Sequence, residues 1–289
     1  MDNTIPISAK TKIFCVIGHP ISHSFSPLIH NYWFKNLGLN SKYIALNVDP
    51  NQLKQATKGL KALNIEGFNV TIPHKEKIIR LIDNVDSLAQ DIGAVNTVKN
   101  EDGYLIGRNT DAIGGKQALL DAGCQIENQN VLVLGAGGAA KAICFALVDV
   151  IDNLVIANRT LKRATILAKE LMKKKDIKIK VINIFAPTLK KELENIDLLI
   201  NTTPIGIYPN KGQSPISKDV LHNDLFIFDL VYNPLETQLL KDATSIGCKS
   251  LGGLDMLINQ GALAFEWWTN KKPNINGIKT KIIEIFGKN

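Results

Sequence analysis

Val131-Leu-Val-Leu-Gly135-Ala136-Gly137-Gly138-Ala139-Ala140 is the stretch that decides the fold of this 289-residue chain. Its four apolar residues predict a strand buried on both faces, as in a parallel sheet covered by helices. A Gly-x-Gly-x-x-Ala turn follows, and residues 141–148 then predict a helix. In such a turn Gly135 permits the tight bend, Gly137 admits a pyrophosphate close to the backbone, and Ala140 allows close helix–strand packing. The stretch therefore predicts a dinucleotide-binding domain of the Rossmann type.

The next predicted strand, residues 153–157, indicates which dinucleotide binds. An NAD site carries Asp or Glu at this point, where the carboxylate binds the ribose hydroxyls. This strand instead ends in Asn158-Arg159-Thr160, and Arg163 follows one turn into the next helix. A guanidinium binds a 2′-phosphate through two hydrogen bonds, whereas a carboxylate repels it. The pattern favours NADP, and the alternative is that Arg159 and Arg163 are ordinary surface charges.

Length and composition are those of a globular protein with one large or two modest domains. The net charge of +7 comes largely from lysines in predicted solvated helices, without interleaved aromatic residues, so nucleic acid is not an expected partner. No apolar run reaches membrane-spanning length, because Lys141 interrupts the longest candidate. Residues 1–4 lack the pattern of a signal peptide. The four cysteines are widely spaced, which predicts neither a metal site nor disulfides and favours a reducing cytoplasm.

A second α/β region precedes the glycine-rich turn. Its predicted elements are a strand at 12–17, a helix from Pro27 to about Leu37, a strand at 42–48, a helix from Asp49-Pro50, a strand at 67–73, and a hairpin of 93–99 and 104–111 around Asn100-Glu-Asp-Gly103. Strand, helix and strand at this spacing predict a crossover unit. The later elements are strands at 179–184, 197–201 and 225–230, a loop at 202–206, a glycine-rich return at 251–256 and a helix at 257–268.

Polar side chains follow one predicted strand and flank the hairpin. Thr71 and Lys75 follow the strand in Asn69-Val-Thr71-Ile-Pro73-His74-Lys75, where open α/β sheets carry functional groups. Periodicity alone also allows Lys75 to be an ordinary exposed lysine. Asn96 and Asp111 lie at the two ends of the hairpin, and Asp111 alternatively caps the helix that begins at residue 112.

Two serines lie at the start of the first predicted helix, in Gly18-His-Pro-Ile-Ser22-His-Ser24-Phe-Ser26-Pro27. Pro27 suits the first helical position and Ser26 suits the N-cap. The hydroxyls of Ser24 and Ser26 beside a helix N-terminus are also suited to bind a carboxylate. His19 and His23 do not predict a metal site, because Pro20 prevents the helix that would align them.

Eight motifs, in order, resemble those of the shikimate and quinate dehydrogenase family over nearly the whole chain. They are Gly18–Pro27, Asn69–Lys75, Gly93-Ala-Val-Asn96-Thr97, Gly107-Arg-Asn109-Thr-Asp111, Gly135–Ala140, Asn158–Thr160, Asp229-Leu-Val-Tyr232 and Gly253-Leu-Asp-Met256-Leu-Ile-Asn-Gln260. The resemblance implies an NADP-dependent oxidoreductase that interconverts shikimate and 3-dehydroshikimate in aromatic amino-acid biosynthesis. It implies an N-terminal α/β substrate domain (1–110 plus 255–289) and a Rossmann-type NADP domain with a parallel sheet (111–254). It further implies a small-molecule substrate, no metal and a cytoplasmic enzyme, and it leaves a homodimer open.

The resemblance also assigns individual residues. Lys75 and Asp111 would be the catalytic pair. The residues that would contact the substrate are Ser24, Ser26, Thr71, Lys75, Asn96, Asp111, Tyr232 and Gln260. Those that would hold NADP are Gly135, Ala136, Gly137, Gly138, Ala139, Ala140, Asn158, Arg159, Thr160, Arg163, Leu230, Gly253 and Met256, with Met256 near the nicotinamide.

Departures from the family pattern are few. Ala112 stands where the family usually has Gly, His74 stands where a bulky apolar residue is common, and the loop 202–206 is slightly altered. None of them removes a reacting group. Oxidation of a secondary alcohol needs a hydride acceptor and a group that takes the hydroxyl proton. Lys75 is the expected proton acceptor, and Asp111 is expected to orient it. A neighbouring carboxylate favours the charged form of a lysine whereas burial favours the neutral form, so this division of roles stays open.

Three other functions compete with this one. A quinate/shikimate dehydrogenase of broader range would tend to use NAD and to carry an acid where this chain has Arg159 and Thr160. A non-catalytic NADP-binding sensor would keep the glycines but lose Lys75 or Asp111, and both are present. A folate- or aldehyde-directed activity would rest on fold analogy alone.

Overall fold

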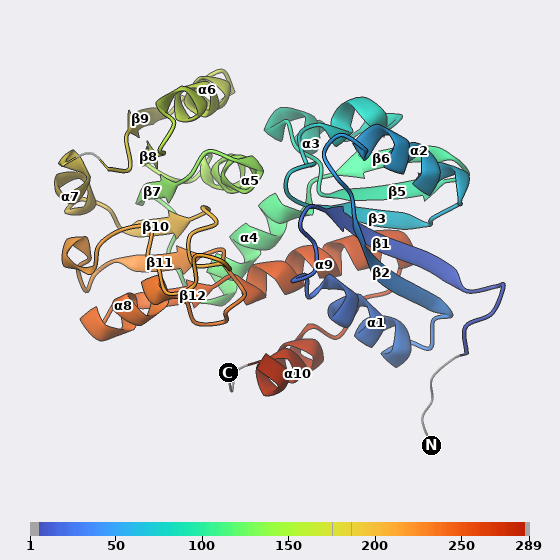
Figure 1. Cartoon of the computed structure of the whole chain (residues 1–289). Helices are drawn as coiled ribbons and strands as arrows, with labels where there is room; N and C mark the ends of the chain where they lie inside the picture. Colours follow the sequence, from blue (N-terminus) through green and yellow to red (C-terminus); the bar gives the residue numbers. More distant parts are fainter. Residues whose placement is uncertain (1–5, 175, 186, 287–289) are drawn as a thin grey trace. The chain divides into compact units, whose positions relative to one another are not determined.

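The computed structural model describes residues 6–174, 176–185 and 187–286 (Figure 1). The chain forms two compact units, of which the first runs to Asp111 and resumes over Ile258–Ile285, and the second spans Ala112–Leu257. The sequence pattern predicts a second domain over 111–254, whereas the compact units divide after Asp111 and after Leu257. The outer parts of the predicted ranges, 1–5 and 287–289, lie outside the described residues, as does the stretch used to assess a signal peptide.

The first unit contains a mixed six-stranded sheet in the order β2-β1-β3-β5-β6-β4. Its strands are β1 (Lys12–Gly18), β2 (Ser41–Asn47), β3 (Gly67–Val70), β4 (Asn84–Val85), β5 (Thr97–Glu101) and β6 (Tyr104–Arg108). Its helices are α1 (Ser26–Asn36), α2 (Leu53–Ala62), the 3₁₀ helix η1 (Ile78–Leu81), α3 (Ser87–Ile92) and α10 (Ile275–Phe286). β1 pairs in parallel with β2 and β3, as the crossover pattern predicts, whereas β5 runs antiparallel to β3 and β6.

This sheet is covered on both faces, which explains the continuous apolar run of β1. Cys15 belongs to a core that includes Leu53 of α2. The preceding residue, Phe14, points to the other face of the sheet. The centre of its ring lies 5.2 Å from the ring centres of Phe34 in α1 and of Trp268. Figure 1 shows α1 and α2 on opposite sides of the sheet. Alternate residues of one strand therefore serve two separate cores.

The second unit contains six strands in the order β12-β11-β10-β7-β8-β9, all parallel. They are β7 (Asn130–Leu134), β8 (Asn153–Ala157), β9 (Lys178–Ile182), β10 (Leu198–Asn201), β11 (Phe226–Asp229) and β12 (Lys249–Gly252). The helices are α5 (Gly138–Leu147), α6 (Leu161–Met172), α7 (Thr188–Leu193), the 3₁₀ helix η2 (Lys218–Val220) and α8 (Gln238–Ile246), with α4 (Thr110–Asp121) and α9 (Leu254–Thr269) continuing into the first unit. This arrangement confirms the predicted Rossmann-type sheet.

β7, the strand that precedes the glycine-rich turn, lies in the middle of this sheet. Val131 and Val133 pack in one core with α5 and α6, and Leu132 and Leu134 pack in another with α7 and α8. One prediction for this unit was wrong. Residues 251–256, expected as a return loop, complete β12 and begin α9, because β11 offers a free edge with which residues 249–252 pair in parallel.

Two helix starts differ from the predictions. α1 begins at Ser26, with Phe25 at the N-cap position, so Ser26 is not the cap. α4 begins at Thr110, so Asp111 lies inside its first turn. The backbone N–H of Thr110 donates to Asn96 Oδ1 at 2.7 Å, and this contact from another element replaces a local cap.

The predicted hairpin is confirmed, with Asp102 and Gly103 at its turn, both in the left-handed region (φ 51° and 86°). This conformation matches a two-residue turn of type I′. The hairpin pairs Thr97 with Arg108, and β3 pairs Asn69 with Thr97. Within the described residues, no helix has the length and apolarity needed to cross a bilayer.

Candidate active site

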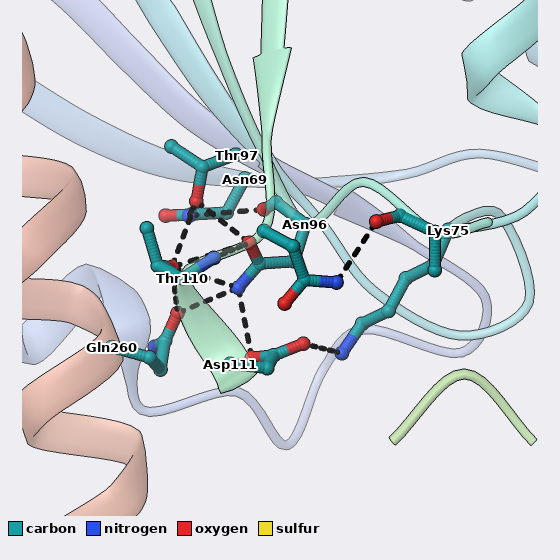
Figure 2. A network of polar contacts seen from close by, with 9 residues as sticks. Asn69, Lys75, Asn96, Thr97, Thr110, Asp111 and Gln260 are labelled. Atoms are coloured by element: carbon teal, nitrogen blue, oxygen red, sulfur yellow. Dashed lines mark hydrogen bonds and ion pairs between the residues drawn. The ribbon is translucent and has the colours of Figure 1, made fainter. Parts of the chain in front are cut away.

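A largely buried ion pair in the first unit joins Lys75 and Asp111, which lie 36 residues apart. Lys75 Nζ is 2.6 Å from Asp111 Oδ2, and the two side chains are 15% and 7% exposed. The loop that carries Lys75 is held by backbone hydrogen bonds, since His74 N–H donates to Thr71 O and Val95 N–H donates to Lys75 O. Lys75 therefore approaches Asp111 from a fixed turn after β3 (Figure 2).

Asn96 determines the orientation of the Asp111 carboxylate. Because Thr110 N–H donates to Asn96 Oδ1, the amide nitrogen of Asn96 must face the other way. That nitrogen donates to Asp111 Oδ1 at 2.8 Å. Each carboxylate oxygen of Asp111 thus accepts a different donor, one from Asn96 and one from Lys75.

Gln260, from α9, lies against the same group (Figure 2). Its Oε1 is 3.2 Å from Asn96 Nδ2 and 3.4 Å from Thr110 Oγ1. Thr110 Oγ1 also accepts from Asn96 Nδ2 at 2.9 Å. Four predicted site residues, Lys75, Asn96, Asp111 and Gln260, therefore belong to one continuous network.

A second row of buried polar residues supports this network and was not predicted as part of the site. The Tyr43 phenol donates to Asn69 Oδ1 at 2.6 Å, and burial raises the pKa of Tyr43, so the phenol stays protonated. Asn69 Nδ2 donates to Thr97 Oγ1 at 3.0 Å, and Thr97 Oγ1 in turn donates to Asn96 Oδ1 at 3.1 Å. The signal that finds these residues is strand register, because Asn69 and Thr97 are cross-strand partners.

Of the predicted hydroxyl groups, that of Ser26 joins this row. Ser26 is buried and hydrogen-bonds the Tyr43 phenol, which links it through Asn69 to the network. Ser24 Oγ accepts from Ser26 N–H at 3.3 Å. The methyl group of Thr71 lies against Gly18, where an added Cβ would come within 2.4 Å of it.

Two histidines of the first unit, His74 and His19, lie against backbone and side-chain oxygens. His74 is fully buried with Nε2 2.7 Å from Val48 O, and His19 Nδ1 lies 3.2 Å from Asn47 Oδ1. Across the part of the chain that the structure describes, no three His, Cys, Asp or Glu side chains converge in a way that could hold a metal ion.

The glycine-rich turn of the second unit has the geometry of a phosphate site. Gly135 has φ +111°, and a Cβ there would lie 2.4 Å from Thr202 Oγ1. A Cβ on Gly137, by contrast, would meet no atom within 4 Å. Gly137 is the N-cap position of α5, and no side chain caps the helix there. The helix N-terminus therefore combines donor groups with open space, which suits a pyrophosphate.

The segment after β8 carries the predicted phosphate-binding arginines. Asn158 Nδ2 donates to Thr160 O at 2.8 Å, which shapes the turn into α6. Arg159 and Arg163 are exposed, and among the described residues neither forms an ion pair with a carboxylate. Arg159 follows the carboxyl end of β8 and Arg163 lies in the first turn of α6, the region where Rossmann-type domains bind the ribose of the dinucleotide.

The remaining predicted residues of this unit differ in accessibility. A Cβ on Gly253 would lie 2.1 Å from Leu230 O, so only glycine fits there. Met256 is buried in the core of the second unit, beside Gly115 of α4. Tyr232 is half-buried, and desolvation raises the pKa of its phenol.

Comparison with known proteins matches the sequence of this chain to one family. Three family profiles match: "Shikimate dehydrogenase substrate binding domain" over residues 16–98, "Shikimate / quinate 5-dehydrogenase" over 117–231, and "Shikimate 5'-dehydrogenase C-terminal domain" over 253–282. The shikimate dehydrogenase (NADP(+)) of Methanocaldococcus jannaschii is 49% identical over 283 residues, which are 98% of this chain and 100% of that protein. The chain belongs to the shikimate dehydrogenase (NADP+) family.

Solved shikimate dehydrogenases share the fold over nearly the full length. A crystal structure of a shikimate dehydrogenase in complex with NADP+ has a TM-score of 0.89 and 46% identity, covering 97% of this chain and 98% of the other. The enzyme of Thermus thermophilus, in complex with NADP(H) and shikimate, has a TM-score of 0.83 and 36% identity, covering 93% of this chain and 98% of the other. The resemblance seen in the eight sequence motifs is thereby confirmed.

Proposed function

We propose that this chain catalyses the reversible NADPH-dependent reduction of 3-dehydroshikimate to shikimate. The observation that carries the proposal is the ion pair of Lys75 and Asp111, held by Asn96 and Gln260 in the first unit of a shikimate dehydrogenase family member. An ammonium beside a fixed carboxylate provides a proton donor at a defined position, which reduction of a ketone requires.

The proton-transfer role falls to Lys75. Asp111 Oδ2 accepts one of the three ammonium N–H groups, so the ammonium has further donors for a substrate oxygen. During reduction Lys75 donates a proton to the oxygen on which negative charge develops, and in the reverse direction the amine takes it back. Asp111 orients the ammonium. NADPH, when bound, supplies the hydride.

The same unit supplies groups that recognise the rest of the substrate. Ser24 and Ser26 lie at the N-terminus of α1, where hydroxyl donors and the helix dipole favour a carboxylate. Asn96 and Gln260 present amide groups next to Asp111 and suit ring hydroxyls. We assign substrate contacts to these residues and to Thr71 and Tyr232.

We assign cofactor binding to the second unit. The open N-terminus of α5 after Gly137 suits the pyrophosphate, and the exposed Arg159 and Arg163 suit the 2′-phosphate. The first unit then holds the substrate. We also place the enzyme in the cytoplasm, because its four cysteines are free and buried, as expected of a protein from a reducing compartment.

A spectrophotometric assay that crosses shikimate and quinate with NADP and NAD tests the proposal. We expect turnover with shikimate and NADP and much weaker turnover in the other three combinations. Comparable rates with quinate and NAD would instead indicate a broader quinate/shikimate dehydrogenase. Tight NADPH binding without turnover of either acid would indicate a sensor and contradict the proposal.

A further inference from the structure

Asp229, the last residue of β11, is a fully buried carboxylate that has no role in the proposed mechanism. An ionised carboxylate without donors would strongly destabilise an apolar interior. Burial raises the pKa of Asp229, and the hydrogen bonds that it accepts act in the opposite direction. The positions of its donors therefore indicate what this group does.

Three donors converge on the two oxygens of Asp229. Oδ1 accepts from Asn201 Nδ2 at 2.8 Å and from Val231 N–H at 3.1 Å, and Oδ2 accepts from the Thr237 hydroxyl at 2.6 Å. The amide of Asn201 has one orientation only, because its Oδ1 accepts from Thr203 N–H at 3.0 Å and from Thr203 Oγ1 at 2.7 Å. The amide nitrogen of Asn201 therefore faces the carboxylate of Asp229.

These donors lie at the carboxyl edge of the sheet, one at the end of β10 and two in the segment that follows β11. Asn201 and Asp229 are register partners at the ends of β10 and β11. Through Asn201 the carboxylate holds the loop 202–206, and through Val231 and Thr237 it holds both ends of the segment 230–237. The segment 230–237 contains Leu230 and Tyr232, which the sequence motifs assign to the cofactor and the substrate.

The strand order shows which half of the dinucleotide lies over these loops. The glycine-rich turn follows β7, and Arg159 follows β8 on one side of it. β10 and β11 lie on the other side of β7. A dinucleotide that crosses the sheet edge with its 2′-phosphate at β8 extends its nicotinamide half over β10 and β11.

We propose that Asp229 is a positioning residue that holds the loops 202–206 and 230–237 in place for the nicotinamide half of the cofactor. This inference rests on the proposed function of the second unit. It predicts that loss of the Asp229 contacts disturbs hydride transfer and leaves binding of the adenosine half unchanged.

The chain offers a matched control, Asp197, at the amino ends of the strands of the same sheet. Asp197 Oδ2 accepts from Asn130 N–H at 2.8 Å and from Asn130 Nδ2 at 3.0 Å. It also joins neighbouring parallel strands, but at their amino ends. A general loss of sheet stability would affect Asp197 and Asp229 variants alike, whereas loss of loop positioning would affect only the latter.

The experiment compares Asp229→Asn, Thr237→Val and Asp197→Asn with the wild type. Amide hydrogen exchange is measured in the loops 202–206 and 230–237, the dissociation constant is measured for 2′,5′-ADP, and kcat and KM are measured with NADPH and 3-dehydroshikimate. In Asp229→Asn and Thr237→Val we expect exchange in both loops to be roughly tenfold faster. We expect kcat/KM to fall roughly 10- to 100-fold and 2′,5′-ADP affinity to stay within about twofold of the wild type.

Asp197→Asn should leave both loops and kcat/KM unchanged. Wild-type exchange in both loops of Asp229→Asn and Thr237→Val would overturn the proposal, as would an equal kinetic loss in Asp197→Asn. If the wild type binds 2′,5′-ADP but does not reduce 3-dehydroshikimate, the proposed function fails. Faster exchange confined to the two loops would in that case still support the positioning role of Asp229.

Discussion

Asn96 Nδ2 donates to Asp111 Oδ1 at 2.8 Å, on the opposite side of the carboxylate from Lys75. Because both oxygens are engaged, the carboxylate plane is held and with it the direction in which the ammonium is offered. The amide of Asn96 is itself oriented by the backbone N–H of Thr110. A neutral amide donor thus determines the placement of the charged pair, and this contact is buried, so salt screens it much less than it screens a surface ion pair.

Replacing Lys75 tests the proton-transfer role. Lys75→Ala is expected to lower kcat by on the order of a hundredfold or more, as loss of a general acid does, while NADPH affinity is retained. Lys77→Ala is the matched control, because this lysine is exposed two residues further along the same turn. A wild-type rate in Lys75→Ala would assign proton transfer to another group.

Replacing Asn96 tests the support of Asp111. Asn96→Leu leaves Asp111 Oδ1 and Thr110 N–H without partners in a buried site, and each unsatisfied group costs about 1–3 kcal/mol. Urea unfolding should show the lost stability, and kcat should fall with it. Asn51→Leu, at an exposed asparagine, should change neither quantity. Full stability in Asn96→Leu would show that water or a side-chain shift replaces these hydrogen bonds.

Two glycines of the same turn should respond differently to alanine. Gly135→Ala strains a backbone at φ +111° and drives a methyl group into Thr202 Oγ1, so the free energy of unfolding should fall by roughly 1–3 kcal/mol. Gly137→Ala meets open space and should fold normally, yet its methyl group occupies the approach of the pyrophosphate and should weaken NADPH binding. Thermal unfolding and calorimetric titration separate the two effects. Equal behaviour of the two variants would contradict the assignment of the turn.

Arg159 should determine the preference for NADPH. Arg159→Ala is expected to weaken NADPH binding by roughly 2–4 kcal/mol through loss of a charge-assisted contact, with little change for NADH. Lys162→Ala, an exposed cation three residues away, controls for the general positive field. If Arg159→Ala weakens NADH and NADPH equally, its guanidinium does not bind the 2′-phosphate.

His30 should make the stability of the first unit depend on pH. Its ring stacks on Tyr43 at 4.2 Å, and burial lowers the pKa of His30 to about 3. The unfolded chain binds a proton at this residue below its ordinary value of 6.5, whereas the folded chain does not, so stability is lost as the pH falls. From pH 8 to pH 5 the loss should be about 2 kcal/mol.

The measurement is chemical unfolding of the wild type and of His30→Phe across that pH range. The variant removes the titrating group and keeps a ring against Tyr43, so its stability should vary less with pH by the stated amount. Parallel pH profiles for the wild type and His30→Phe would show that His30 becomes protonated within the folded protein.

Much of the fold follows from local sequence patterns. The apolar run of β7 and the glycines after it predict a Rossmann-type sheet, because few other arrangements bury such a strand and bend so tightly. Shorter elements escape this reasoning. β4 has two residues and β12 ends in glycine, so neither shows strand periodicity, and each forms because a neighbouring strand offers a free edge.

The site was predictable only in part for a related reason. Lys75, Asn96, Asp111 and Gln260 stand in recognisable motifs, and one network joins them. The supporting contacts of Asn69, Thr97 and Thr110 depend on strand register and on a helix start that is capped from another element. Linear spacing does not contain this information. The surroundings of Asp229 likewise depend on its register partner Asn201 and on Thr237, so its motif alone does not predict a role for the carboxylate.

The pairing of Asn69 with Thr97 has a consequence for how this chain tolerates change in length. Side chains alternate between the two faces of a strand, so a single residue inserted between Asn96 and Thr97 would turn Thr97 away from Asn69 and detach it from Asn96. An insertion at the turn of Asp102 and Gly103 leaves that relationship intact. Length variation among descendants of this protein should therefore accumulate at the tip of the hairpin and avoid its base.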